Sequence, residues 1–129
     1  MIATPDGTLF LMDAGRLRKV FPDRTVTTIV KGLSGRGRSK SEAAKLNYHM
    51  GLWMDRERRV YLPAAAEKLV LRVDGLGKVS IVLDRLRRAP WGGMVDQDGR
   101  LWILEYDSAN AVCVRGINGA VNERVFKAA

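Results

Sequence analysis

One phrase, made of a short apolar strand, a polar turn and an aromatic-bearing strand, occurs three times in this 129-residue chain and limits its fold more than any other feature. The copies read IATPDGTLFL (2–11), GLWMDRERRVYL (51–62) and GMVDQDGRLWIL (93–104). The alignment predicts one extra residue in the turn of the second copy. An aromatic residue stands between aliphatic ones in each second strand: Phe10, Tyr61 and Trp102. Such a repeat indicates that each copy folds into the same unit.

Each copy continues with a third apolar stretch, a turn and a fourth stretch: KVF-PDR-TVTTIV, RVD-GLG-KVSIVL and VRG-ING-AVNERVF. Four short strands in about 40 to 45 residues, repeated along a chain, are typical of β-propeller blades. We therefore predict an all-β protein of three four-stranded propeller blades in a single domain. The predicted parts are a first blade at 1–33, a basic insertion at 34–46, a second blade at 47–88 and a third blade at 89–129. Ser39 and Glu42 have capping-box spacing, which predicts one short helix through SEAAKL in the insertion.

The third copy, PWGGMVDQDGRLWILEYDSANAVCVRGINGAV, resembles one blade of the NHL-repeat, SMP-30/gluconolactonase and streptogramin-lyase-like group of propellers. In that group a Pro and a Gly lead into the inner strand, and an Asp-Gly turn, an aromatic-bearing strand and a Gly turn follow. The matching residues are Pro90 with Gly92, Asp98 with Gly99, Trp102, and the segment from Gly116 to Gly119. The resemblance covers nearly the whole chain outside the insertion and implies a propeller fold. It leaves the function open, because the group includes lactonases, lyases and binding modules.

The resemblance also raises the question of a metal ion. SMP-30-like members hold a divalent cation with a Glu, an Asn and an Asp, the last two in NG and PDG motifs. At the matching places this sequence has HMG (49–51) and PWG (90–92). Methionine and tryptophan cannot replace oxygen ligands for a hard cation. We therefore expect no metal ion here, and no other cofactor.

Three blades do not complete a ring, since closed propellers usually have about 4 to 8 blades. An outer blade with no neighbour would expose apolar surface of a size that is rare in monomers. We therefore predict a homodimer in which the first blade of one copy packs on the third blade of the other, which closes a six-bladed propeller. The alternative is that the chain is a fragment of a longer propeller.

The charge of the chain is unbalanced, with 22 Lys and Arg against 14 Asp and Glu, a net charge of +8. Eight of these cations fall in the two connections between blades, which are expected on one face of the ring: Lys31, Arg36, Arg38, Lys40, Lys45, Arg85, Arg87 and Arg88. Such a rim would attract phosphates or carboxylates in a salt-sensitive manner. The simpler interpretation is a solvated surface. The ligand-binding candidates from this rim are Arg36, Arg38, Arg85, Arg87 and Arg88. No aromatic residue lies within SGRGRSKSEAAK (34–45), which disfavours single-strand binding by stacking.

His49 is the only histidine and precedes the inner strand of the second copy, so we expect it at the mouth of the central channel. In a dimer it would occur twice across the axis, as part of a symmetric metal or acid/base site or as a plain channel-lining residue. The second interpretation is favoured, because no Cys, Asp or Glu stands at ligand spacing from it.

Four further candidates lie in LEYDSAN (104–110) and APWGG (89–93). Glu105 and Asp107 are candidates for a carboxylate pair, and Asn110 is a candidate ligand contact. The alternative, which we favour, is a turn whose polar side chains cap their own backbone. A fourth candidate, Trp91, is expected to pack at the channel mouth and alternatively to provide a stacking floor for a ligand.

These features predict a self-assembling half-propeller, a non-catalytic or weakly specialised binding module, that binds an anionic small molecule or polymer at a basic face and central channel. One alternative is a hydrolase or lyase of the gluconolactonase or streptogramin-lyase type that uses His49 and Glu105. Another is RNA or DNA binding through the basic rim. No signal-peptide pattern and no run of about 20 apolar residues is present, so we expect a cytoplasmic protein with no membrane partner. The single cysteine, Cys113, is expected to be a buried thiol.

Overall fold

The computed structural model describes residues 1–33, 51–65, 67–106, 112–118 and 122–127. Within these residues the chain consists of β-strands and connections, with no helix. No helix long and apolar enough to cross a membrane is therefore found in this described part of the chain. The helix predicted for SEAAKL lies outside the described residues.

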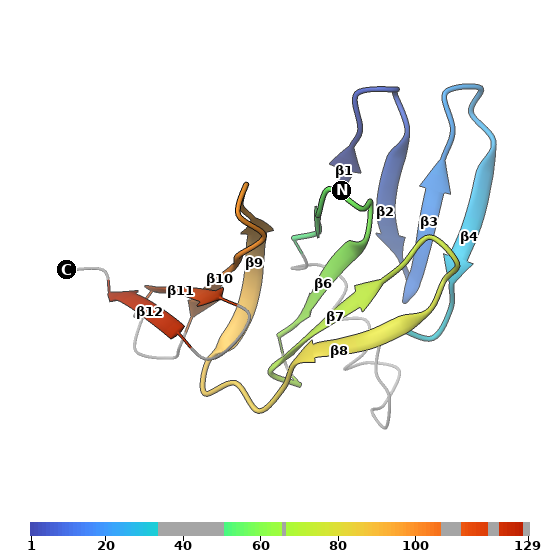
Figure 1. The fold of residues 1–129 in the computed structure, drawn as a ribbon. Coiled ribbons are helices and arrows are strands. Elements are labelled where there is room, and N and C mark those ends of the chain that lie inside the picture. The colour runs from blue at the N-terminus through green and yellow to red at the C-terminus, as the bar shows by residue number, and fades with distance from the viewer. Residues whose placement is uncertain (34–50, 66, 107–111, 119–121, 128–129) are drawn as a thin grey trace. The chain divides into compact units, whose positions relative to one another are not determined.

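The strands form three four-stranded antiparallel sheets, each made of strands that are consecutive in the chain (Figure 1). The first sheet contains β1 (Ile2–Ala3), β2 (Leu9–Asp13), β3 (Arg16–Val20) and β4 (Val26–Val30). The second sheet contains β5 (Trp53–Met54), β6 (Val60–Ala64), β7 (Leu69–Val73) and β8 (Val79–Leu83). The third sheet contains β9 (Ala89–Val95), β10 (Leu101–Tyr106), β11 (Val112–Asn118) and β12 (Asn122–Lys127). The prediction of an all-β chain with four-stranded antiparallel sheets is confirmed.

The turn between the first two strands has the same geometry in all three sheets. In the third sheet the Asp96 N–H donates to the Arg100 carbonyl over 2.9 Å, and the Gly99 N–H donates to the Asp96 carbonyl over 3.1 Å. The same two bonds are made in the other sheets by Thr4, Gly7 and Thr8 and by Asp55, Arg58 and Arg59. The fourth residue of each turn has a left-handed backbone, with φ of 84° at Gly7, 60° at Arg58 and 79° at Gly99. Glycine is the residue that adopts this conformation at least cost.

Equal turns mean that the extra residue predicted for the second copy does not exist, so that prediction was wrong. Trp53 pairs with Tyr61 in the second sheet, and Met94 pairs with Trp102 in the third. Gly51 is therefore equivalent to Gly92. The sequence alignment had matched Gly51 with Gly93 because both are glycines that precede an apolar strand.

The second and third sheets share an apolar core. Its buried members are Trp53, Tyr61, Val70, Leu86 and Ile103. The rings of Trp53 and Tyr61 stack with centroids 5.5 Å apart and an interplanar angle of 11°. Ile103 is fully buried in this core, and Leu101 packs against it. Since successive strand residues point to opposite faces, Trp102 and Leu104 point to the other face of the third sheet.

By the density of its internal contacts the chain divides into two compact units, residues 1–50 and 51–129. The first sheet belongs to the first unit. The second and third sheets belong together in the second unit, which also holds the predicted site residues Arg85, Arg87, Arg88, Trp91 and Glu105.

Candidate functional site

The connections from β6 to β7 and from β8 to β9 lie at the same end of the second sheet (Figure 1), and both carry basic residues. We call this the connection end, and we call Lys68, Arg85, Arg87 and Arg88 the basic cluster. Lys68, Arg85 and Arg87 are exposed, and Arg88 is half-buried. The nearby acidic residues are Glu67, half-buried, and Asp84, exposed. Positive charge therefore predominates at this end of the sheet.

The two connections that carry the basic cluster are tied to each other. The Leu86 N–H donates to the Lys68 carbonyl over 3.0 Å, and Lys68 Nζ donates to the Arg87 carbonyl over 3.3 Å. The side chain of Leu86 is buried in the core, which anchors the segment between Arg85 and Arg87. The cations are thus held on an anchored backbone.

Two residues of the basic cluster have an unusual backbone conformation. The φ angles of Lys68 and Arg85 are 55° and 52°, in the left-handed region. The first sheet has glycine at both equivalent places, since the Leu33 N–H donates to the Gly15 carbonyl just as that of Leu86 donates to Lys68. The second sheet therefore has a long cationic side chain at two places where glycine would be less strained.

Two more of the predicted site residues lie at the same end of the third sheet. Trp91 is half-buried near the start of β9, and its carbonyl accepts a hydrogen bond from the Gly51 N–H over 3.3 Å. Glu105 lies within β10, opposite Pro90 of β9, at a point where the register of the two strands shifts. Its side chain is fully buried. A group in that position has no direct access to a ligand in solvent.

The remaining predicted site residues lie outside the described part of the chain: Arg36, Arg38, His49, Asp107 and Asn110. The predicted partnership of His49 with Glu105 and the predicted pair of Glu105 with Asp107 therefore stay predictions. Within the described residues, no three His, Cys, Asp or Glu side chains are grouped so that they could hold a metal ion.

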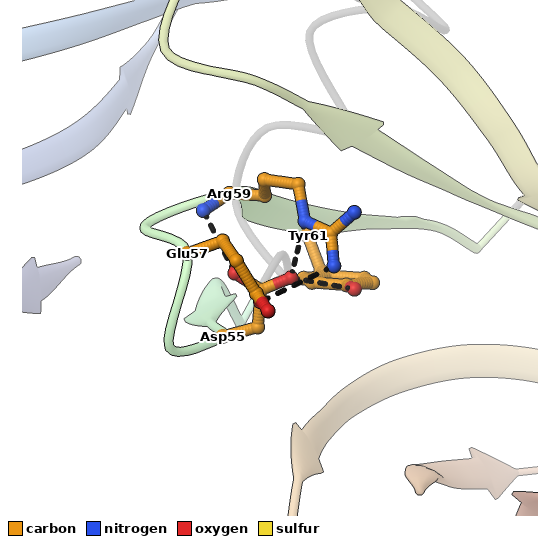
Figure 2. A network of polar contacts seen from close by, with 4 residues as sticks. All are labelled: Asp55, Glu57, Arg59 and Tyr61. Atoms are coloured by element: carbon orange, nitrogen blue, oxygen red, sulfur yellow. Dashed lines mark hydrogen bonds and ion pairs between the residues drawn. The ribbon is translucent and has the colours of Figure 1, made fainter. Parts of the chain in front are cut away.

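A polar network that was not predicted lies at the opposite end of the second sheet (Figure 2). The Asp55 carboxylate is 2% exposed and accepts hydrogen bonds from Arg59 Nε over 2.7 Å and from the Tyr61 hydroxyl over 2.9 Å. It also accepts the Arg59 N–H over 2.9 Å. Glu57 completes the network through Arg59 Nη2, at 3.3 Å.

These contacts set the ionisation of the network. Burial disfavours the charge of Asp55, but the hydrogen bonds from the Arg59 backbone, the Tyr61 hydroxyl and the Arg59 guanidinium together hold the pKa of Asp55 below its ordinary value. Burial, and then the bond to Asp55, raise the pKa of Tyr61. Asp55 is thus an ionised carboxylate whose oxygens are already bonded within the sheet, which is the arrangement of a structural group.

The third sheet repeats this arrangement. Asp96 accepts the N–H groups of Asp98 and Arg100 and the Trp102 indole Nε1–H, each over 2.9 Å. The indole bond lowers the pKa of Asp96. The sequence signal for both networks is an Asp six residues before the aromatic residue, in DRERRVY and DQDGRLW. The polar ends of Tyr61 and Trp102 are thereby fixed to the turn of their own hairpin.

Comparison with known proteins identifies the fold. No family model matches this chain, and no curated protein matches it. Among solved structures it is similar to virginiamycin B lyase from Staphylococcus aureus, with 13% identity and a TM-score of 0.65 over 98% of this chain and 39% of that one. A streptogramin B lyase gives 12% identity and a TM-score of 0.65 over 97% of this chain and 38% of that one.

A gluconolactonase from Xanthomonas campestris gives 16% identity and a TM-score of 0.64 over 96% of this chain and 44% of that one. These neighbours have propeller-type folds, so the predicted resemblance to this group is confirmed at the level of the fold. The chain spans about two fifths of the length of each of them.

Proposed function

We propose that this chain is a binding module for an anionic small molecule or polymer, and that the basic cluster is its binding surface. The observation that carries the proposal is the grouping of exposed Lys68, Arg85 and Arg87 on two connections that are hydrogen-bonded to each other and anchored by buried Leu86. Cations held on a fixed backbone attract phosphates and carboxylates with less loss of conformational entropy than cations on free loops.

The backbone conformation supports the same proposal. A side chain in the left-handed region costs about 1–2 kcal/mol relative to an ordinary backbone. The second sheet accepts this cost at Lys68 and Arg85, at places where the first sheet has Gly15 and Gly32. The second sheet thus holds a long cation at both places despite this cost.

The test is a calorimetric titration of the full chain with inorganic polyphosphate over a series of salt concentrations. We expect the logarithm of the affinity to fall linearly with the logarithm of the salt concentration. The variant Arg85→Gly/Arg87→Ala removes two cations from the basic cluster, and glycine suits the backbone of residue 85. It should bind polyphosphate about tenfold more weakly and show a shallower salt dependence.

The matched control removes the same amount of charge from the opposite end of the same sheet. Arg56 and Arg58 are exposed in the turn between β5 and β6, and glycine suits the backbone of residue 58. Arg56→Ala/Arg58→Gly should weaken binding by less than about twofold. Equal losses in the two variants would show that net charge, and not the basic cluster, attracts the polyanion. A wild-type chain that does not bind would overturn the proposal.

Single-stranded RNA serves as a second probe, because nucleic acid is an alternative polyanion. Binding of RNA at least about tenfold tighter than polyphosphate of equal charge, lost in the Arg85→Gly/Arg87→Ala variant, would assign the basic cluster to nucleic acid. Equal affinities would support a general preference for anions.

A second candidate function is the hydrolase or lyase activity that the neighbours' names describe. It is supported by the shared fold, and it depends on His49 and Glu105 as the acid and base. We rank it second, because the Glu105 side chain is fully buried and a fold is shared by many functions. Turnover of a gluconolactone or a streptogramin B by the wild type, lost in His49→Ala with folding unchanged, would place this candidate first.

A further inference from the structure

The third sheet has an apolar flank on the face that points away from the second sheet. Trp102 and Leu104 of β10 and Met94 of β9 belong to this flank, and Met94 and Leu104 are 54% and 41% exposed. They surround an open apolar hollow of about 380 Å³ that also includes Gly92, Gly93 and Ile103. We call Met94, Trp102 and Leu104 the outer flank.

In the second sheet the residues equivalent to the outer flank are buried. By strand register, Trp53 is equivalent to Met94, Tyr61 to Trp102 and Pro63 to Leu104, and all three residues of the second sheet are buried. Trp53 and Tyr61 lie in the core with Ile103, and the indole of Trp53 contacts Gly93 of β9. The second sheet therefore packs against the third sheet through the face that the third sheet itself leaves exposed. We call this interface between the second and third sheets the joint.

The first sheet has apolar residues at the positions that form the third-sheet side of the joint. Its residues Ala3, Leu9 and Leu11 are equivalent to Val95, Leu101 and Ile103, the residues with which the third sheet faces the core. Leu9 and Leu11 are half-buried, and Ala3 is exposed. Val20 of β3 pairs with Leu9 and is half-buried, and Val26 of β4 pairs with Val20 and is 55% exposed. We call Ala3, Leu9, Leu11, Val20 and Val26 the leading flank.

The leading flank also exposes positions that the second sheet buries. Val60, Leu62 and Val73 of the second sheet are 2%, 1% and 1% exposed. Their equivalents by strand register are Leu9, Leu11 and Val20, each half-buried. Contiguous apolar surface of this kind marks an interaction site.

We propose that the outer flank of the third sheet binds the leading flank of the first sheet of a second copy of this chain. Both flanks repeat, position by position, the two sides of the joint between the second and third sheets. Two copies related by a twofold axis make this joint twice, so each outer flank and each leading flank is covered.

One pair of residues supports this choice of occupant. In the existing joint the large Trp53 indole faces Gly93, where a Cβ would lie 2.8 Å from the indole Cζ2. At the equivalent positions of the proposed joint, Met94 replaces the tryptophan and Met1 replaces the glycine. Met1 is 76% exposed. The loss of a large ring on one side is matched by a longer side chain on the other, and methionine adapts readily to the space it meets.

The test is the mass of the full chain in solution, by light scattering after size exclusion and without any anionic ligand. We expect twice the 14.3 kDa of one chain. Leu104→Arg places a charge in the outer flank, so it should weaken the dimer about tenfold or more and shift the mass to one chain. Met94→Lys, at a side chain more than half exposed, should do the same if Leu104→Arg fails to fold.

The matched control is Leu76→Arg. Leu76 is 97% exposed in the turn between β7 and β8 of the second sheet and belongs to neither flank. This variant should keep the mass of two chains. Circular dichroism checks that each variant is folded.

A wild-type mass of one chain would overturn the proposal. So would a dimer that persists in both Leu104→Arg and Met94→Lys. The proposal does not rest on anion binding, because the mass is measured without ligand and Arg85→Gly/Arg87→Ala leaves both flanks intact. A dimer that fails to bind polyphosphate would refute the proposed function alone.

Discussion

The indole of Trp53 lies so close to Gly93 that a Cβ at residue 93 would stand 2.8 Å from the indole Cζ2 and 2.9 Å from its Cε2. Trp53 comes from β5, the first strand of the second sheet, and Gly93 comes from β9, the first strand of the third. The same indole stacks on the ring of Tyr61. The joint between the two sheets is therefore built around one indole that contacts both Tyr61 of its own sheet and Gly93 of the third sheet.

Gly93→Ala should destabilise the chain by about 1–3 kcal/mol, since the added methyl group would clash with the Trp102 carbonyl oxygen of the neighbouring strand as well as with the Trp53 indole. The matched control is the adjacent Gly92→Ala, because a Cβ there meets no atom within 4 Å. It should change the free energy of unfolding by less than about 0.5 kcal/mol. Urea denaturation followed by tryptophan fluorescence measures both values. Equal effects of the two substitutions would contradict this account of the joint.

The repeated sheets could be predicted because their signals are local. Alternating apolar residues, turn residues such as Asp98 and Gly99, and one aromatic residue in each copy specify hairpins without reference to distant parts of the chain. The exact alignment of the copies could not be obtained from glycines. Gly51 and Gly93 share a residue type, but the turn hydrogen bonds make Gly51 equivalent to Gly92.

The candidate site was harder to predict, because burial depends on register. Glu105 follows an apolar run and precedes polar residues, so the sequence favours a turn. In the structure β10 continues to Tyr106, and the register with β9 shifts between Leu104 and Glu105. Glu105 is therefore buried in a sheet. Arg85 and Arg87 are exposed, and their use as a binding surface stays a proposal.

The network around Asp55 predicts a large effect of one buried carboxylate. Asp55→Ala leaves the Tyr61 hydroxyl and Arg59 Nε without their acceptor, so it should destabilise the chain by about 1–3 kcal/mol. Glu57→Ala is the control, because the Glu57 side chain is 69% exposed and contacts the same guanidinium. It should cost less than about 0.5 kcal/mol. Thermal unfolding of both variants measures the two losses of stability. A loss in Glu57→Ala as large as that in Asp55→Ala would contradict the special role of the buried carboxylate.

The pKa of Asp55 gives that stabilisation a definite pH dependence. The folded pKa lies below the ordinary value, so the unfolded chain binds the proton more readily than the folded one. The contribution of Asp55 is therefore complete above about pH 4, the ordinary value for an aspartate, and is lost as the pH falls through the folded pKa. The difference in unfolding free energy between wild type and Asp55→Ala should be constant from neutral pH down to about pH 5 and shrink below about pH 4. A difference that stays constant in acid would show that Asp55 acts through packing and not through its charge.

The left-handed residue in the first turn of the second sheet, Arg58, predicts one stabilising substitution. Arg58 has a φ of 60° where the equivalent residues are Gly7 and Gly99, so its backbone is strained by the presence of a Cβ. Arg58→Gly relieves this strain, and part of the gain is offset by the greater freedom of glycine in the unfolded chain. The net result should be an increase in stability of about 0.5–1 kcal/mol, measured by thermal unfolding. The reverse change, Gly99→Arg, should lower stability by about 1 kcal/mol, because it introduces the same strain at a φ of 79°. If Arg58→Gly destabilises the chain while Gly99→Arg does not, the two turns are not equivalent in energy, and Arg58 makes a contact that outweighs its backbone strain.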